Sequence, residues 1–378
     1  MSKNKLKILT LNTWGIPLMA DIDTRVKALA EALATCDYDV VCLQEVWDKD
    51  NLMKIADGAR SGGLIYQHHF RSGKFGSGLV TLSRYPIVNV NFHKFRLAGR
   101  IDTFWHGDYF AGKGIGLTQI DSPMGIIDVY NIHPIAQYHS DDRDEYKAHR
   151  ATQHYEVTQF IAQQSNHNPI IAMGDFNMLD HQIGYRLITQ LSQLRDCWHD
   201  AYPDEAGATF VKSNHYNRKK TLPTDERLDY IFINQHLKSN TVAITHTQID
   251  GKNIPYSDHY GVAVDLTINE SKDSDSEIDT AIIKPVLEEL ADVLAVGIMD
   301  AEYRQKSFKQ HGKMSANAII PLTFMGRLLN KSYSKWIFIL LNIYSFMAWF
   351  IAEFNIGDEI TQISTIADEV QHRINTMD

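Results

Sequence analysis

The sequence predicts an α/β domain with buried sheets, followed by a helical C-terminal region. Short apolar stretches of strand length alternate with amphipathic helical stretches, such as 24–33 and 149–164. A polar run without apolar side chains, 269–277, then interrupts the chain. Beyond it we expect an amphipathic or buried helix over 282–299, followed by a more apolar tail. The expected units are a folded domain over 1–268, a linker over 269–280 and a helical region over 281–378.

Six predicted strands of the first domain carry polar side chains at or next to one end. The polar residues are Asn, Glu, His and Asp, and the strands are short apolar or alternating runs. In chain order they are 6–11 with Asn12, 40–43 with Glu45, 128–132 with His133, 169–173 with Asp175 and Asn177, 227–233 with Asp229 inside the strand, and 260–266 preceded by Asp258 and His259.

The cluster after the fourth of these strands is the most informative. Alternate residues of an extended chain point the same way, so Asp175 and Asn177 can grip one ligand together. Asp and Asn also end strands and start turns, so one such cluster has an ordinary structural explanation. Six clusters of this composition are hard to produce by strand capping alone. As a set they predict a metal-dependent phosphoesterase.

The metal expected at this site is Mg²⁺, with Mn²⁺ as an alternative ion. A hard divalent cation prefers oxygen ligands, and Mg²⁺ uses one or two carboxylates together with water and substrate phosphate. Glu45 is the first choice as a ligand, with Asn12 beside it and Asp258 closing the shell. No Cys and His spacing in the sequence suggests structural zinc.

Hydrolysis also requires a base for the attacking water. His259 is the best candidate, because the unperturbed pKa of histidine is close to neutral pH. Asp229 or Asp175 can orient its imidazole, as carboxylates do in other hydrolases. Asn177 and His133 can donate hydrogen bonds to the phosphate.

Composition excludes some classes of protein. A net charge of -9 and an isoelectric point near 6.0 argue against a generally basic nucleic-acid-binding protein. Cys36, Cys42 and Cys197 form no metal or disulfide pattern, which favours a reducing compartment. The N-terminal residues lead directly into the first strand, so we expect no signal peptide.

The ordered set of polar motifs resembles the endonuclease/exonuclease/phosphatase superfamily. The resemblance extends over residues 5–267. The motifs that carry it are 11–14, 44–46, 174–177, 227–230 and 257–259. It implies a DNase-I-like, four-layered β-sandwich flanked by helices, with a Mg²⁺ site at one sheet edge.

The same resemblance implies roles for individual residues. Glu45 corresponds to the principal metal ligand, and His259 corresponds to the general base. Asn177 and His133 correspond to phosphate contacts. The role of Asp175 differs between members of the superfamily, where it is an orienting group, a base or a transition-state stabiliser.

Four further segments are similar to the neutral sphingomyelinases, namely 12–17, 68–73, 76–79 and 106–117. In that family an Asp and a Lys spaced like Asp108 and Lys113 contribute to substrate engagement and activation. The alternative is an ordinary surface ion pair, worth about 0–1 kcal/mol. This chain departs from the family at Ile135, where a second His is common, so rim contacts and headgroup preference are expected to differ.

The C-terminal region contains a stretch of about 17 uncharged residues, 336–352. As a helix it would be about 26 Å long, slightly less than the ~30 Å of a bilayer core. Trp336 and Trp349 lie near its two ends, where interfacial anchors belong. Lys331 and Lys335 precede it, so the basic-flank rule places the catalytic side in the cytoplasm.

We therefore expect a membrane-associated tail. The alternatives are a helix buried in a protein core and a helix lying in the membrane interface. A weaker apolar stretch, 316–329, contains Pro321 and Arg327 and would be the second arm of a hairpin. Single-pass and hairpin arrangements both stay open.

The leading hypothesis is Mg²⁺-dependent, phospholipase C-type hydrolysis of a sphingolipid, with sphingomyelin converted to ceramide and phosphocholine. The expected partners are a sphingolipid substrate and a membrane, without nucleic acid. The alternatives on the same fold are an inositol-phosphosphingolipid phospholipase, an inositol-phosphate phosphatase and a nuclease. A catalytically silent, membrane-tethered binding module is the alternative from a different class.

Overall fold

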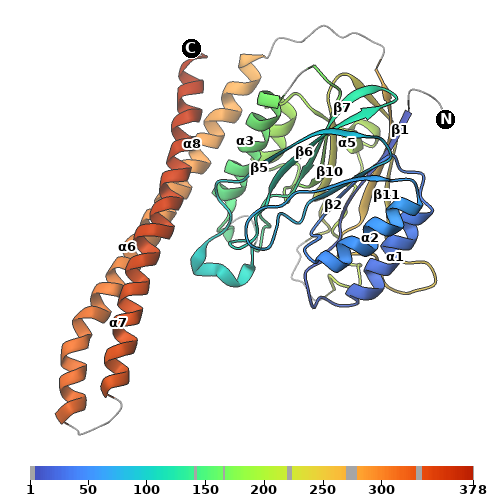
Figure 1. The fold of residues 1–378 in the computed structure, drawn as a ribbon. Coiled ribbons are helices and arrows are strands. Elements are labelled where there is room, and N and C mark those ends of the chain that lie inside the picture. Colours follow the sequence, from blue (N-terminus) through green and yellow to red (C-terminus); the bar gives the residue numbers. More distant parts are fainter. Residues whose placement is uncertain are drawn as a thin grey trace.

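Two packed β-sheets with helices on their outer faces form the body of the protein, and two long C-terminal helices run beside it (Figure 1). The computed structural model describes residues 5–139, 143–164, 167–218, 224–269, 279–328 and 334–377. Most of the predicted linker, 270–278, lies outside these described residues. The predicted α/β sandwich flanked by helices is confirmed.

Twelve strands of the described chain make two six-stranded sheets. The first sheet consists, in spatial order, of β11 (Leu237–Thr245), β12 (Gly261–Ile268), β1 (Lys5–Asn12), β2 (Val40–Gln44), β4 (Val80–Ser83) and β3 (Tyr66–His69). The second consists of β5 (Ile87–Lys94), β6 (Gly114–Ser122), β7 (Gly125–Ile132), β8 (Ile170–Asp175), β10 (Asp229–Ile233) and β9 (Arg195–Asp196).

Strand pairing gathers the predicted polar clusters at one end of the sandwich. β1 and β2 are parallel neighbours in which Asn12 is paired with Gln44, and β7 and β8 are parallel neighbours in the other sheet. β10 runs antiparallel to β8, with Asp229 directly across from Asp175. The carboxyl ends of parallel strands share an edge, so the polar residues that follow them meet there.

Side chains alternate between the two faces of each strand, so the protein has one core between the sheets and two more between the sheets and the helices. Ile8 and Val40 of the first sheet pack against Val129 and Ile171 of the second, within the sandwich. The opposite faces pack against helices, with α1 (Ile22–Ala34) and α2 (Lys49–Ser61) on the first sheet and α3 (Lys147–Gln164) on the second. Burial of each large aliphatic side chain contributes about 1.5–3 kcal/mol, so these three clusters fix the sandwich.

The remaining helical segments of the sandwich are short. They are η1 (Ile101–His106), α4 (Ile183–Arg186), η3 (Leu187–Leu191) and α5 (Cys197–Ala201).

The C-terminal region forms a helical hairpin. Its first arm, α6 (Thr280–Leu328), is one continuous helix with Pro285 and Pro321 inside it, so it joins the predicted helix 282–299 to the weaker apolar stretch. The second arm consists of α7 (Ser334–Phe350), η4 (Ile351–Ile356) and α8 (Gly357–Asn375). Ser315 Oγ donates to the carbonyl of Leu341 at 3.1 Å, and Gln305 Nε2 donates to that of Ala352 at 3.0 Å, which fixes the arms as antiparallel neighbours.

Only one end of this hairpin packs on the sandwich. Leu287, Leu290 and Leu294 of α6, together with Ile363 and Val370 of α8, share a buried cluster with α3 and η3. The other end projects away from the sandwich (Figure 1). That end exposes large apolar side chains, among them Ile320, Phe324, Trp336, Leu340, Ile343 and Phe346.

Candidate active site

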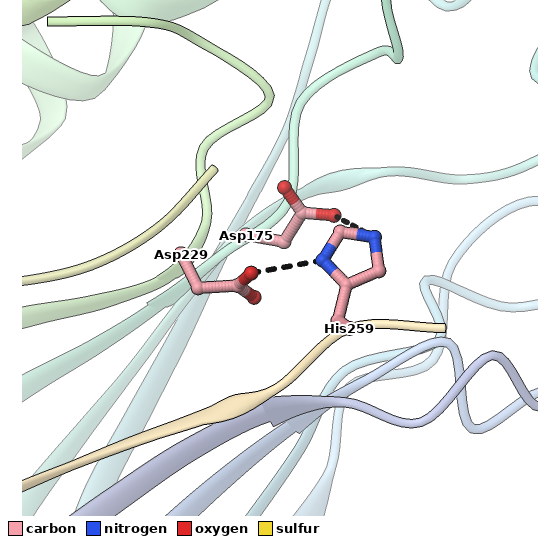
Figure 2. A group of neighbouring side chains, drawn as sticks. All are labelled: Asp175, Asp229 and His259. Atoms are coloured by element: carbon pink, nitrogen blue, oxygen red, sulfur yellow. Dashed lines mark hydrogen bonds and ion pairs between the residues drawn. The ribbon is translucent and has the colours of Figure 1, made fainter. Parts of the chain in front are cut away.

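His259 lies between two aspartates at the shared edge of the sheets (Figure 2). Its Nδ1 lies 2.8 Å from Asp229 Oδ2, and its Nε2 lies 3.9 Å from Asp175 Oδ2. All three side chains are buried. The Asp229 contact requires the proton on Nδ1, which leaves Nε2 as the reactive ring nitrogen. This assignment distinguishes the two carboxylates that the sequence left interchangeable.

A second group of polar side chains surrounds Glu45. Asn12 Nδ2 donates to Glu45 Oε1 at 3.1 Å and to Asp175 Oδ2 at 2.8 Å. His133 Nε2 lies 3.8 Å from Glu45 Oε1 and 3.7 Å from Asp175 Oδ2. Asp175 therefore belongs to both groups and joins Glu45 to His259.

Backbone conformation at this edge is strained. Glu45 has φ = 60° and Asn177 has φ = 47°, both in the left-handed region that non-glycine residues rarely occupy. A Cβ on Gly15 would lie 2.3 Å from the carbonyl oxygen of Glu45, so the loop after β1 passes directly over this residue. Tertiary packing, rather than local preference, holds Glu45 in place.

Asp108 and Lys113 form a buried ion pair of 2.8 Å, not an exposed one. Tyr138 donates from its hydroxyl to Asp108 Oδ2 at 2.6 Å. Lys113 Nζ also donates to the carbonyl of Pro134 at 3.1 Å, and Asn177 Nδ2 donates to the same oxygen at 3.2 Å. This shared acceptor connects the pair to the predicted phosphate contacts.

Charges within the site act strongly on one another. Burial alone would lower the pKa of His259, but Asp229 and Asp175 outweigh it and raise this pKa to about 10. Burial raises the pKa of Glu45, Lys113 opposes the increase, and Asp258 adds to it. Burial, with Lys113 and His259, holds the pKa of His133 well below its ordinary value. His133 is therefore neutral and can donate a hydrogen bond to an anion.

The residues at Glu45 fit a divalent cation. Glu45 Oε2 is buried and makes no hydrogen bond within the described residues, so a carboxylate oxygen there lacks compensation. Asp258 acts electrostatically on Glu45, and its Oδ1 accepts from Ser257 at 3.2 Å. Asn12 turns its amide nitrogen to the two carboxylates, while its oxygen accepts from the amide of Trp14 at 3.0 Å. Asp175, Asp229 and His259 are a second buried group that could hold an ion, but the Asp229 contact occupies one ring nitrogen.

Sequence reasoning missed several groups that hold the site. Tyr138 follows no motif or periodic pattern that would have identified it. Arg25 is buried in α1 and donates to the carbonyls of Thr13, Trp14 and Ala20, which fixes the loop after β1. Asn214 and Asn217 donate to the backbone carbonyl of Asp258 at 3.2 and 2.7 Å. Their contacts span about 41–44 positions of chain, so no local signal marks them.

Ile135, the position where a second His was expected from the resemblance, is fully buried. Its backbone amide donates to Gln153 Oε1 at 2.7 Å. The side chain is thus part of the interior and contributes nothing to the rim of the site. The expected difference in rim contacts concerns a His that this chain lacks, and it stays a prediction.

Comparison with known proteins identifies the family of the chain. The model of the endonuclease/exonuclease/phosphatase family matches residues 9–259. The chain is 32% identical over 297 residues to an inositol phosphosphingolipids phospholipase C of Schizosaccharomyces pombe, which covers 70% of this chain and 69% of that protein. It is 33% identical over 282 residues to sphingomyelin phosphodiesterase 2 of Rattus norvegicus, which covers 71% of this chain and 66% of that protein.

Solved structures agree on the fold. An endonuclease/exonuclease/phosphatase of Beutenbergia cavernae superposes with a TM-score of 0.52 at 19% identity, covering 70% of this chain and 72% of that one. A beta toxin of Staphylococcus aureus superposes with a TM-score of 0.51 at 18% identity, covering 68% and 99%. Together with the sequence matches, these results show that the chain belongs to the endonuclease/exonuclease/phosphatase family and, within it, to the neutral sphingomyelinase group of phosphodiesterases.

Proposed function

We propose that this protein is a Mg²⁺-dependent, phospholipase C-type hydrolase of a sphingolipid, with sphingomyelin as the first substrate. One observation carries the proposal: His259, oriented by Asp229, shares a buried cluster with Glu45, Asp175 and His133. A base, carboxylate ligands and neutral hydrogen-bond donors are what hydrolysis of a phosphodiester needs. The relatives named above supply the substrate class.

His259 takes the proton in the proposed reaction. In the neutral form of the ring, which the reaction requires, Nε2 carries no proton and accepts one from the water that attacks phosphorus, while Nδ1–H keeps its hydrogen bond to Asp229. The new P–O bond forms as the bond between phosphorus and the ceramide oxygen breaks. That oxygen takes a proton from solvent and leaves as an alcohol, while His259 returns to solvent the proton that it took from the water. Asp175 stabilises the imidazolium from 3.9 Å.

Phosphate binding is assigned to the uncharged donors. His133 has no hydrogen-bond partner at either ring nitrogen within the described chain, so its N–H is available to a phosphoryl oxygen. Asn177 Nδ2 lies beside it on the carbonyl of Pro134, from which it can turn to the same ligand. Neither donor adds a charge that would trap the anionic product.

Glu45 is the proposed principal ligand of Mg²⁺, with Asn12 and Asp258 beside it, and Mn²⁺ is the proposed substitute. The uncompensated Oε2 of Glu45 supports this choice. For Asn12 to offer its oxygen, the amide must turn away from the N–H of Trp14. When bound there, the ion would polarise a phosphoryl oxygen and, through its charge, favour the neutral form of His259.

Asp108 and Lys113 are proposed to organise the substrate side of the site. Lys113 holds the Pro134 carbonyl that also receives Asn177, so a change in the ion pair would move a phosphate contact. Because the pair is buried, removal of one partner would leave an uncompensated charge. We therefore expect Lys113→Ala to reduce kcat rather than only KM.

The helical hairpin is proposed to attach the enzyme to a membrane. Among the described residues, one helix, Lys335–Asn375, is long and apolar enough to cross a bilayer, and only 11% of its apolar window is buried in the protein. The exposed apolar residues of α6 face outward beside it, which favours a hairpin over a single pass. We also propose that the catalytic domain ends near residue 268 and that a linker joins it to the hairpin.

Orientation in the membrane is proposed on different grounds from those of the sequence. Lys335 is the second residue of α7, which begins at the end of the hairpin remote from the sandwich (Figure 1). Glu353 belongs to η4, where Asn355 donates to Tyr109 of the catalytic domain, and Lys331 falls outside the described residues. A basic flank at that end does not argue for a catalytic domain in the cytoplasm. The free thiols of Cys36, Cys42 and Cys197 favour a reducing compartment, and on that ground we propose the cytoplasm.

An assay of purified full-length protein in detergent tests the function. With Mg²⁺, we expect phosphocholine release from sphingomyelin, loss of activity with chelator, and a kcat lower by about 10²–10⁴ in His259→Ala. His181→Ala changes an exposed histidine and serves as the matched control. No release from sphingomyelin or an inositol phosphosphingolipid would overturn the proposal.

The second candidate substrate is an inositol phosphosphingolipid. The relative from Schizosaccharomyces pombe is named for that substrate, and this chain matches 69% of its length. The same assay offers this lipid, phosphatidylcholine, inositol phosphates and an abasic DNA duplex in parallel. A higher kcat/KM for the inositol lipid would replace sphingomyelin as substrate. Cleavage of DNA or free inositol phosphates alone would favour a nuclease or phosphatase, and inactivity towards all would favour a binding module.

A further inference from the structure

The segment that carries Asp108 also carries exposed aromatic side chains. Phe104 and Trp105 at the end of η1 are 54% and 66% exposed, and Phe110 is 39% exposed. The neighbouring loop contributes Phe75, which is 64% exposed. Large aromatic side chains are seldom left in water without a partner, so this aromatic loop patch (Phe75, Phe104, Trp105 and Phe110) requires one.

The two loops form a single surface. Gly112 donates its amide to the carbonyl of Gly76 at 2.9 Å, and the rings of Phe75 and Phe110 meet edge to face at 6.2 Å. Consecutive turns close from Gly107 to Phe104 and from Phe110 to Gly107, at 3.1 and 3.0 Å. The aromatic side chains are therefore presented together, not scattered.

On one side this surface borders the active site. Asp108 lies between Trp105 and Phe110 in the chain, and it holds Lys113 and Tyr138 at 2.8 and 2.6 Å. The ring of Tyr138 stacks on that of His106 at 4.0 Å. A molecule that touches the aromatic loop patch thus lies next to the substrate side of the site.

On the other side the same segment is bound to the hairpin. Asn355 of η4 donates to the hydroxyl of Tyr109 at 2.6 Å, and Arg304 of α6 lies 3.7 Å from Asp102. In Figure 1 the segment after β5 extends from the sandwich on the side of α6 and α7. If the apolar end of the hairpin is in a bilayer, the patch lies between that bilayer and the active site.

The chemistry of the patch matches the headgroup region of a lipid bilayer. Trp and Phe insert at this depth, where their apolar rings leave water and the indole N–H of Trp stays hydrated. Arg71 and Lys74 are exposed in the loop that carries Phe75, and their charges complement lipid phosphates. The patch is joined to the exposed apolar hairpin, and this arrangement suits one extended lipid surface better than a protein partner.

We propose that the aromatic loop patch is a second membrane-contact site, which inserts into the headgroup region of the bilayer and seats the active site on its lipid substrate. This proposal rests on the membrane attachment of the hairpin proposed above. It differs from that attachment because the contact is made by the catalytic sandwich itself. It predicts that Phe75 and Trp105 enter the lipid while distant surfaces of the sandwich do not.

The test places an environment-sensitive NBD label at single cysteines of the full-length chain in vesicles of phosphatidylcholine and sphingomyelin. Labels replace Phe75, Trp105, Met53 or Phe346 in a Cys36→Ser background, since Cys42 and Cys197 are buried. Met53 is 49% exposed on α2, which lies on the side of the sandwich away from the hairpin (Figure 1), and Phe346 of α7 is 59% exposed. Doxyl-labelled phosphatidylcholine is the quencher.

We expect labels at positions 75 and 105 to be quenched at least about half as strongly as the label at 346, because the patch lies at interfacial depth. The label at 53 should not be quenched. Quenching at 346 with none at 75 and 105 would overturn the proposal while the hairpin stays in the membrane. A blue shift at 75 and 105 without lipid quenching would also overturn it, in favour of a protein partner. Loss of quenching at 346 would defeat the membrane attachment first.

A native-side-chain measurement covers the case in which a labelled variant fails to fold. Tryptophan emission is compared between the unmodified chain and Trp105→Phe in vesicles with brominated phosphatidylcholine. We expect the quenchable fraction to fall in Trp105→Phe, since one of six tryptophans would leave the lipid. An unchanged quenchable fraction would overturn the proposal. Neither measurement uses catalysis, so failure of the proposed reaction would not be mistaken for failure of this contact.

Discussion

Glu45 combines two local costs that an ordinary surface carboxylate avoids. Its backbone has φ = 60°, and burial raises the pKa of its side chain. Strained backbone and uncompensated carboxylates persist only where the surrounding structure or a ligand offsets them. Packing of the loop after β1 holds the backbone of Glu45, and the cation proposed above would compensate its carboxylate.

Glu45→Gln separates the effect of this carboxylate on stability from its proposed role in binding Mg²⁺. Without metal, the variant should be at least as stable as the native chain, because a neutral amide replaces a buried carboxylate. Saturating Mg²⁺ should stabilise the native chain by about 2–3 kcal/mol and the variant by much less. Thermal unfolding with chelator and with Mg²⁺ measures both effects. Glu205→Gln changes an exposed carboxylate and is the control; an equal response to Mg²⁺ in all three proteins would contradict the assignment.

Because His154 is buried, we expect the protein to lose stability in acid. Burial lowers its pKa to about 4 from the ordinary 6.5, and Nε2 donates to the carbonyl of Phe176 at 2.9 Å. As pH falls below 6.5 the unfolded chain takes up a proton that the folded chain excludes until about pH 4. This residue alone should therefore reduce the free energy of unfolding by about 2 kcal/mol between pH 7 and 5.

The check is urea unfolding at pH 7 and pH 5 for the native chain, His154→Gln and His215→Gln. Glutamine can keep the hydrogen bond to Phe176 without titrating. The pH dependence should shrink in His154→Gln and persist in His215→Gln, where the histidine is exposed. The same pH dependence in all three proteins would show that His154 does not carry it.

At the scale of elements, a buried polar link holds the two sheets in register beneath the active site. Gln44 at the end of β2 donates to Asn131 of β7 at 2.8 Å, and Asn131 donates to the carbonyls of Leu43 and Val80 at 3.1 and 3.0 Å. Gln44 is adjacent to Glu45 in the chain. The link therefore fixes the distance between the sheet that carries Glu45 and the sheet that carries Asp175.

Asn131→Ala should lower the free energy of unfolding by about 2–3 kcal/mol, because it leaves buried donors and acceptors unpaired. Asn89→Ala removes an exposed side chain-to-side chain bond and should change stability by less than about 0.5 kcal/mol. Denaturant unfolding of both variants provides the comparison. Equal effects would mean that the link is not a stabilising element.

At the scale of the whole molecule, half of the C-terminal region belongs to the folded body. α6 and α8 share a buried cluster with α3 and η3, and Arg186 of α4 forms an ion pair with Glu289 of α6. In the part of the hairpin that the structure describes, the apolar half has no such cover. The tail is therefore anchored to the enzyme at one end and free for the membrane at the other.

Leu290→Ala tests this anchor. Leu290 is fully buried in the shared cluster, and its truncation should reduce stability by about 2–5 kcal/mol and increase protease cleavage after residue 279. Val296→Ala lies in the same helix at 67% exposure and should have less than about 0.5 kcal/mol of effect. Unfolding and limited proteolysis in detergent compare the two. Similar protease resistance in both variants would argue against a docked tail.

Much of the fold could be predicted because its signals are local. The strand ending at Asn12 and the one ending at Asp175 were recognisable from apolar runs, and the observed bounds differ by one or two residues. The helix predicted over 282–299 extends to Leu328, since the docked packing of its first half and its pairing with α7 override Pro321. Local propensity could not show that pairing.

Which polar residues form the candidate site, and that they lie at strand ends, could be predicted from the amino-acid sequence, because alternation and apolar runs are read along a single segment. The sequence also identified the apolar half of the tail. Only the tertiary structure decided that Asp229 rather than Asp175 holds His259, that Tyr138 binds Asp108, and that the tail docks on α3. These contacts join residues from 30 to roughly 200 positions apart, and side-chain geometry at that range is set by how elements pack, which no local pattern encodes.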